Sequence, residues 1–445
     1  MTQSMGQTPP GLTRLREAAR QDRRLRFTNL LHHLSPELLE QAYYALNRQA
    51  KPGVDGEDWA RFGEDLPARL ADLHARIQSN RYKPQPVKRV HIPKPDGQQR
   101  ALGVTTVEDK VVQQALVWVL ESIYEVDFVG FSYGFRPGRD QHQALDAVYM
   151  AITTRRVNWV LDADIAGFFD SIDHDWLMRL LEVRIADRRI LRLIERMLKA
   201  GVMENGRRSK QQVGTPQGAV ISPLLGNIYL HYALDRWVQQ WRQRHARGEV
   251  YVVRYADDAV AGCQYQADAE QLHRELDARL RRFALGLHDD KTRLIEFGRF
   301  ARSNRRRRGQ GKPATFDFLG FTHICSQRRR DGGFKLKRIS MAKRLRAKLH
   351  QIKHVLYRYR HSDPHVVGRW LHRVVQGFFN YHAIPDNHQA LQTFRTAVNR
   401  YWFRALRRRS QKTADLPWHR FQRLVRRYIP TVRVLHPYPN QRLRV

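Results

Sequence analysis

Cysteine and long apolar stretches are both nearly absent from this sequence. Its 445 residues include two cysteines, Cys263 and Cys325, which lie far apart and belong to no Cys-x-x-Cys pair. This pattern predicts neither a structural zinc site nor a disulfide framework. No apolar run approaches the ~20 residues that a membrane-spanning helix requires, and the N-terminus lacks the apolar core of a signal peptide. The sequence therefore argues against a membrane partner and predicts a cytoplasmic protein.

Acidic residues are also scarce. The chain has 43 Asp and Glu residues against 79 Lys and Arg residues, which gives a formal net charge of +36. Such an excess implies a polyanionic partner, and nucleic acid is the leading class. The hydrophobic content of 42% excludes wholesale disorder. The length predicts two to four domains or lobes.

Two adjacent carboxylates stand inside an otherwise apolar stretch, Val252–Val260. The β-branched residues on both sides predict a β-hairpin with Asp257 and Asp258 at its tip. Carboxylates that converge at a turn repel one another unless a cation lies between them, and hard oxygen ligands suit Mg²⁺. An ordinary solvated turn explains the same pair, because Asp favours tight turns.

A second strand with an acidic end strengthens the metal hypothesis. The stretch from Trp159 runs as an apolar strand into Asp164 and is followed by a small-residue turn. Two acidic strand ends in a strongly basic chain suggest the carboxylate set of a two-metal phosphoryl-transfer site. We interpret Asp162 and Asp170 as structural or solvated residues outside that set.

The segment Tyr255-Ala256-Asp257-Asp258 resembles the signature motif of reverse transcriptases, and its alanine variant resembles the proteins encoded by bacterial group II introns. Four other segments resemble blocks of the same family: Lys51–Gly56, Gly134–Gly138, Gly214–Gly218 and Phe316–Phe321. Many members end in a cysteine-bearing HNH endonuclease domain, and we expect this chain to lack one.

The resemblance implies an α+β fold, a right-hand polymerase with fingers, a ferredoxin-like palm and a helical thumb. Its expected parts are a basic N-terminal extension with the start of the fingers (1–65), fingers (66–150), palm (151–330) and thumb/maturase region with a tail (331–445). The predicted order of strand, helix, strand, hairpin, helix and strand independently favours a ferredoxin-like sheet. Residues 298–313, with four consecutive arginines, are expected to form a solvated loop, and three basic helices are expected beyond Lys335.

The resemblance also implies roles for individual residues. The expected catalytic residues are Asp164, Asp257 and Asp258, which with the carbonyl of Ile165 would hold two Mg²⁺ ions, with Mn²⁺ as a possible substitute. The expected nucleotide-binding residues are Lys94, Arg100, Phe169 and Gln217. The expected template and primer contacts are Arg136, Arg139, Tyr255, Lys291, Leu319 and Gly320. The stretch from Tyr82 to Gly103 predicts an antiparallel hairpin whose turn is flanked by Lys94 and Arg100. Simpler explanations exist for some of these residues, because basic hairpin tips discourage edge pairing and Phe169 could be a core aromatic.

These residues imply an RNA-directed DNA polymerase that takes an RNA template, a DNA primer and deoxynucleoside triphosphates. Binding of a structured intron RNA to assist splicing and mobility is a second implied function. Two alternatives stay open, a splicing maturase without polymerase activity and a host-domesticated reverse transcriptase, for example in phage defence. The sequence does not indicate an oligomeric state.

Overall fold

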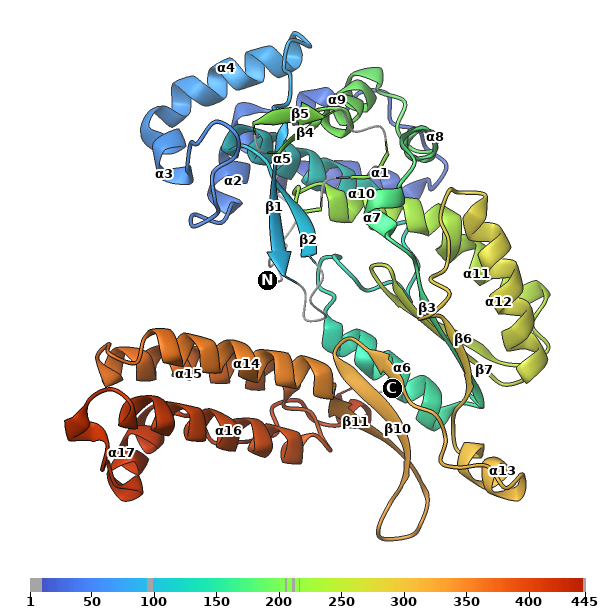
Figure 1. Cartoon of the computed structure of the whole chain (residues 1–445). Coiled ribbons are helices and arrows are strands. Elements are labelled where there is room, and N and C mark those ends of the chain that lie inside the picture. The colour runs from blue at the N-terminus through green and yellow to red at the C-terminus, as the bar shows by residue number, and fades with distance from the viewer. Residues whose placement is uncertain (1–9, 94–98, 205, 210–212, 216, 443–445) are drawn as a thin grey trace. The chain divides into compact units, whose positions relative to one another are not determined.

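The computed structural model describes residues 10–93, 99–204, 206–209, 213–215 and 217–442 (Figure 1). The chain forms two compact units: residues 1–144 with 159–294, and residues 145–158 with 295–445. In the described parts of the chain, no helix combines the length and the apolar character needed to cross a membrane. The fold is mixed α and β.

The first unit is built around one long buried helix, α5 (Val107–Tyr124). Thr106 begins it by accepting a hydrogen bond from the backbone of Asp109, and most of its side chains are buried. Helices α1 (Thr13–Gln21) and α2 (Pro36–Ala45) pack against it. The other helices of this part are α3 (Trp59–Phe62), α4 (Leu66–Gln78), α8 (His174–Glu182) and α9 (Arg188–Leu198).

A small sheet with the strand order β2-β1-β4-β5 contains the predicted basic hairpin. Strands β1 (Val87–Pro93) and β2 (Gln99–Val104) pair antiparallel, with Ile92 opposite Arg100. Strands β4 (Val202–Glu204) and β5 (Arg207–Ser209) extend the sheet. The hairpin is confirmed, whereas its tip, with Lys94, lies outside the described residues.

The central sheet has the order β6-β7-β3-β8. Its strands are β3 (Trp159–Asp164), β6 (Val250–Tyr255), β7 (Asp258–Cys263) and β8 (Arg293–Glu296). In chain order the first strand lies between the third and the fourth, which is the order of a ferredoxin-like sheet. Helix α12 (Gln266–Arg281) packs on β3 and β7, and α11 (Arg236–Arg244) lies beside α12 (Figure 1).

The segment before this hairpin is one long helical rod with an irregularity. Helix α10 (Ser222–Leu230) continues through a π-helical turn, His231–Asp235, into α11. A short helix, α7 (Phe168–Ser171), follows β3. In α10, Ser222 is the first helical residue and Ile221 occupies the N-cap position.

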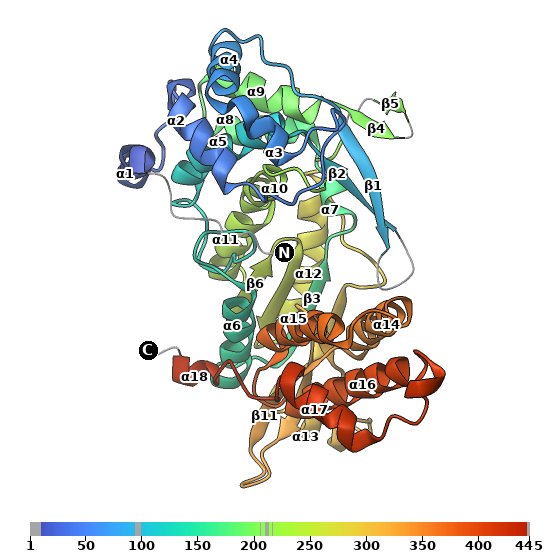
Figure 2. The same ribbon diagram turned by 90° about the vertical axis from the view of Figure 1, so that its left-hand side faces the viewer.

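The second unit combines a three-stranded sheet with a helical bundle. The sheet has the order β11-β10-β9, formed by β9 (Phe316–Phe318), β10 (Phe321–Gln327) and β11 (Phe334–Ser340). The helices are α14 (Ala342–Arg358), α15 (Pro364–His382), α16 (His388–Arg407), α17 (Trp418–Tyr428) and α18 (Pro439–Arg442). Helices α14 to α17 lie side by side around a core that includes Phe379, Phe394 and Trp402 (Figure 2). Helix α6 (Gln141–Thr154) begins in the first unit and continues into the second.

Two expectations for this unit need correction. The arginine-rich segment is not wholly a solvated loop, because α13 (Ala301–Arg307) forms within it. Asn304 donates to Glu296 at 3.0 Å, and Arg308 forms an ion pair with the same largely buried carboxylate. The basic region also contains two helices more than the three expected, α17 and α18. Both differences arise because local charge disfavours these helices, whereas packing of an amphipathic face or a bond to a buried partner stabilises them in the folded unit.

Candidate active site

The β6–β7 hairpin presents the two adjacent aspartates at a two-residue turn. Tyr255 pairs with Asp258, which leaves Ala256 and Asp257 as the turn residues. Ala256 has a φ of +56°, a left-handed conformation that two-residue hairpins normally assign to glycine, asparagine or aspartate. The turn is therefore held in a backbone conformation that alanine rarely adopts.

The second acidic strand end lies beside this turn. In the β3–β7 register Asp164 is directly opposite Asp258. Directly opposed residues of antiparallel strands project from the same face, with Cβ atoms roughly 4.5–5.5 Å apart. The two carboxylates, 94 positions apart in the sequence, therefore share one face of the sheet. Their side chains are half-buried.

Asp164, Asp257 and Asp258 together form what we call the carboxylate corner. Its electrostatics are set by burial and by repulsion between the carboxylates. Burial raises the pKa of Asp257, and the neighbouring Asp164 carboxylate raises it further, while Arg100 and Arg254 oppose the shift. The Nζ atom of Lys291 lies 2.9 Å from Asp164 Oδ2. The site thus concentrates negative charge that favours a nearby cation.

Lys291 is one of the expected template or primer contacts, and its ammonium group lies on Asp164 in the structure. The turn that carries it is fixed to the same strand end, because His288 N donates to the carbonyl oxygen of Asp164 at 2.8 Å. Lys291 N in turn donates to the carbonyl oxygen of His288 at 3.1 Å. This lysine belongs to the carboxylate corner.

The carboxylate oxygens of this site are ligands that suit Mg²⁺, but the protein supplies few of them. Among the described residues, no three Asp, Glu, His or Cys side chains form a ready-made metal cage. Mg²⁺ does not need one, because it usually binds one or two carboxylates together with waters and substrate phosphates. Asp164 and Asp257, which interact electrostatically, supply such a pair.

The predicted nucleotide-binding residues come from three segments of the first unit. Arg100 is exposed on β2 and close enough to lower the pKa of Asp257 against the dominant effect of burial. The amide nitrogen of Gln217 donates to Asp170 Oδ2 at 3.4 Å. Phe169 is partly buried, with its ring 5.0 Å from that of Phe168.

Main-chain contacts bring Phe169 and the loop of Gln217 together. Thr215 N donates to the carbonyl oxygen of Phe169 at 2.8 Å. Gly103 N, at the end of the basic hairpin, donates to the carbonyl oxygen of Gln217 at 2.6 Å. Gly218 has a φ of +112°, and a Cβ there would lie 2.7 Å from the carbonyl oxygen of Gly103. Glycine is therefore required for this close approach of loop and hairpin.

Arg136 does not fit the expected template contact. It is 5% exposed, and its guanidinium binds Glu125 and the carbonyl oxygens of Val129 and Ser132. Because these bonds satisfy the buried group inside the loop, its role is structural. Arg139 is half-buried and donates to the carbonyl oxygen of Gly130 at 2.5 Å.

The remaining predicted contacts lie at two places. Tyr255 is half-buried and shares the face of Asp258. Leu319 and Gly320 form the β9–β10 turn in the second unit, with φ values of +46° and +82°. The hydroxyl of Tyr381 donates to the carbonyl oxygen of Leu319 at 2.7 Å, which fixes this turn within its own unit.

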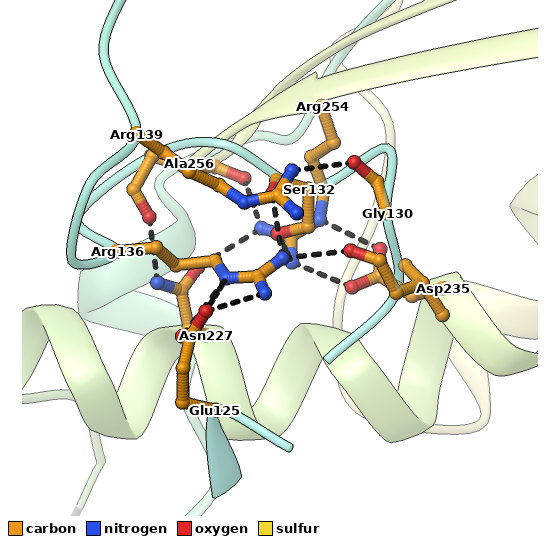
Figure 3. A network of polar contacts seen from close by, with 11 residues as sticks. Glu125, Gly130, Ser132, Arg136, Arg139, Asn227, Asp235, Arg254 and Ala256 are labelled. Carbon is orange, nitrogen blue, oxygen red and sulfur yellow. Dashed lines mark hydrogen bonds and ion pairs between the residues drawn. The ribbon is translucent and has the colours of Figure 1, made fainter. Parts of the chain in front are cut away.

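Sequence reasoning overlooked the buried polar cluster behind the turn formed by Ala256 and Asp257. Arg254, Asp235, Asn227 and Ser132 meet there, together with the carbonyl oxygen of Ala256 (Figure 3). One signal was available: Arg254 is a charged residue in the middle of an apolar strand. A charge at such a position requires a buried partner.

Comparison with known proteins identifies the family. A family model described as reverse transcriptase (RNA-dependent DNA polymerase) matches residues 92–323, more than half of the chain. The chain belongs to the reverse transcriptase family. The matched region contains the whole carboxylate corner, including Asp164, Asp257 and Lys291.

Relatives place this reverse transcriptase family member with the group II intron-encoded reverse transcriptases and maturases. Protein YkfC of Escherichia coli is 36% identical over 271 residues, which cover 56% of this chain and 71% of that protein. Group II intron-encoded protein LtrA of Lactococcus lactis is 38% identical over 226 residues, covering 50% of this chain and 37% of that protein. Nuclear intron maturase 1 of Arabidopsis thaliana is 36% identical over 97 residues, covering 21% and 13%. The chain thus matches most of the length of YkfC and little more than a third of LtrA.

Proposed function

We propose that this protein copies RNA into DNA by adding deoxynucleotides to the 3′-hydroxyl of a primer. The observation that carries this proposal is the register that sets Asp164 opposite Asp258, beside the turn residue Asp257, in a chain of the reverse transcriptase family. Three carboxylates at one strand edge, surrounded by a strongly basic chain, suit transfer of a nucleotide whose phosphates bring negative charge.

Asp164 and Asp257 would hold two Mg²⁺ ions, with Asp258 and the main-chain carbonyl of Ile165 as supporting ligands. When bound, such ions would supply a lowered pKa for the attacking hydroxyl and charge stabilisation for the leaving pyrophosphate, and Mn²⁺ would substitute. Lys291 holds Asp164 in place through its ion pair. The three carboxylates must be ionised to act as ligands, so the raised pKa of Asp257 makes the site sensitive to acid.

The nucleotide would lie between the basic hairpin and the loop of Gln217. Arg100 neutralises phosphate charge, and we assign the same role to Lys94. Gln217 offers an uncharged amide to the nucleotide, and Phe169 excludes a 2′-hydroxyl by steric contact. The main-chain bonds that join Phe169, Thr215, Gln217 and Gly103 support this grouping.

The same proposal extends to architecture. Residues 66–150 would act as fingers, 151–330 as palm and 331–445 as thumb and maturase region, after a basic extension over 1–65. Leu319 and Gly320 would lie at the primer, and Arg139 and Tyr255 at the template or primer.

Primer extension on an RNA template with Asp257→Asn tests the proposal. The variant keeps the size of the side chain and removes the charge that a metal ligand needs, so incorporation should fall at least a thousandfold, about 4 kcal/mol of barrier. Asp162→Asn is the matched control, because Asp162 lies on the same strand as Asp164 and pairs with Arg293 at 3.6 Å. Near wild-type incorporation by Asp257→Asn would exclude the proposed catalytic assignment.

We further propose that the protein binds a structured intron RNA and assists its splicing. The relatives described as intron-encoded proteins and maturases, and the net charge of +36, favour this second function. Asp257→Asn separates the two functions, because it removes polymerase chemistry and leaves the basic surface unchanged. Sequencing of RNA that co-purifies with this variant should recover one enriched intron. Recovery of bulk cellular RNA without enrichment would argue against the splicing role.

A further inference from the structure

A fully buried arginine lies directly behind the turn residues Ala256 and Asp257, which we call the catalytic turn on the basis of the proposed function. Arg254 is on β6, two residues before Ala256, and is 0% exposed. Successive residues of a strand project to opposite faces, so Arg254 points away from the face that carries Tyr255 and Asp258. Its guanidinium lies among helices and loops of the first unit (Figure 3).

The guanidinium contacts four separate parts of the unit. Nε and Nη2 bind Asp235 Oδ1 and Oδ2 at 2.7 and 2.6 Å. Nη1 donates to Asn227 Oδ1 at 3.1 Å and to the carbonyl oxygen of Ala256 at 2.8 Å. Nη2 also donates to Ser132 Oγ at 2.6 Å. A guanidinium has five N–H donors in a rigid plane, and these contacts use every nitrogen of that plane.

The partner carboxylate owes its position to the irregular turn of the helical rod. Asp235 is the last residue of the π-helical segment between α10 and α11, and it is 0% exposed. Insertion of a π turn changes the direction of every later side chain, and such turns are frequent at functional sites. Burial raises the pKa of Asp235, and Arg254 opposes this shift. The ion pair is bidentate and has no solvent access.

The same arginine connects the catalytic turn to the loop at 130–139. Tyr133 N donates to the carbonyl oxygen of Arg254 at 2.8 Å, and Arg254 N donates to that of Phe131 at 2.9 Å. Asn227 completes the connection by donating to the carbonyl oxygen of Gly134 at 2.7 Å. Loop and turn are therefore attached to one rigid group.

We propose that Arg254 is a positioning residue that fixes the direction of Asp257. Its bond to the carbonyl oxygen of Ala256 holds the peptide between Ala256 and Asp257, and so restrains the turn in which Ala256 has its positive φ. Asp235 and Asn227 hold the guanidinium in turn, and Ser132 attaches the loop to the same point. The inference rests on the proposed polymerase function, because it concerns how a metal ligand of that function is oriented.

Arginine rather than lysine is needed at this position. An ammonium group has three donors around one nitrogen and cannot reach Asp235, Asn227, Ser132 and Ala256 together. Arg254→Lys therefore keeps the buried charge and the ion pair but loses the bond to Ala256 or the bonds to the loop. Arg184→Lys is the matched control. Arg184 is 1% exposed in the same unit, pairs with Asp127 at 3.3 Å and donates to the carbonyl oxygens of Ala19 and Asp22.

The experiment measures single-nucleotide incorporation and thermal unfolding for both variants. We expect Arg254→Lys to lower kcat by about a hundredfold, the usual effect of a reacting group misplaced by ~1 Å, with little change in KM for the nucleotide. Mn²⁺ binding, followed by electron paramagnetic resonance of the protein with primer and template, should weaken as well. Arg184→Lys should lower the melting temperature and leave kcat unchanged.

A rescue variant separates positioning from stability. Glycine adopts positive φ without steric cost, so Ala256→Gly in the Arg254→Lys background should recover part of the lost kcat. Equal losses of kcat in the two lysine variants, or no recovery with Ala256→Gly, would overturn the proposal. If Arg254→Lys does not fold, Ser132→Ala removes one bond and leaves the ion pair, and an unchanged kcat there overturns the coupling. An active Asp257→Asn would refute the polymerase proposal itself, so the two failures are distinguishable.

Discussion

Replacement of Gly134 by alanine should directly disturb the turn at Ala256 and Asp257 that we propose to be catalytic. A Cβ at this position would lie 2.3 Å from Ala256 N, 3.0 Å from the carbonyl carbon of Tyr255 and 3.1 Å from the Cα of Ala256. Real Cβ atoms do not approach closer than 3.0 Å, so loop and turn must separate by at least 0.7 Å. All three obstructing atoms belong to backbone and cannot rotate away.

The cost can be estimated from packing and from positioning. Overpacking of this kind costs about 1–3 kcal/mol of stability. A displacement approaching 1 Å at a catalytic group lowers the rate by about a hundredfold. Because the turn is also bound by Arg254, the displacement falls on the loop and on Asp257 together. The expected result is a strong loss of kcat with a moderate loss of stability.

Gly130→Ala provides the control within the same loop. Gly130 is exposed, and a Cβ there would meet nothing within 4 Å. Primer extension and thermal unfolding of the two variants, measured side by side, give the comparison. If Gly134→Ala matches Gly130→Ala in both kcat and melting temperature, the close packing of loop on turn does not exist in solution.

Three further predictions concern selectivity, nucleic-acid binding and pH. Phe169→Ala should raise ribonucleotide incorporation relative to deoxynucleotide on the order of a hundredfold, whereas Phe168→Leu, in the core, should leave this ratio unchanged; equal ratios would refute the sugar contact. If the basic surface neutralises ~8 phosphates, log affinity for RNA should fall against log salt with a slope of roughly −6 to −7, and a flat titration would exclude that surface. Burial, and then Arg338, lower the pKa of His323 from 6.5 to about 3. As the pH falls, the unfolded state therefore takes up a proton at this histidine before the folded state does. The free energy of unfolding, at its full value above pH 6.5, should decrease by about 2 kcal/mol between pH 7 and pH 5. His323→Phe should flatten this part of the melting-temperature profile, and an unchanged profile would contradict the assignment.

Local chemistry let the sequence predict many element boundaries. Ser35 before Pro36, Thr106 and Asp187 are residue types that typically begin helices, and each of their side chains accepts a backbone hydrogen bond at a helix start. Such caps act over three residues, so their signal is complete within a short window. The basic hairpin and the strands that lead to Asp164 and Asp257 were also readable, because apolar alternation is local.

By itself, then, the sequence determined the family motifs, the excess of positive charge and the positions of the carboxylates along the chain. Only the tertiary structure decided which charges meet. It placed Lys291 on Asp164, buried Arg136 in its own loop, and joined Arg254 to Asp235, Asn227 and Ser132. The physical reason is that a charged side chain has the same local signature whether it is solvated or buried. The partner of a buried charge is selected by strand register and helix packing between distant segments, and these contacts form only when the whole unit folds.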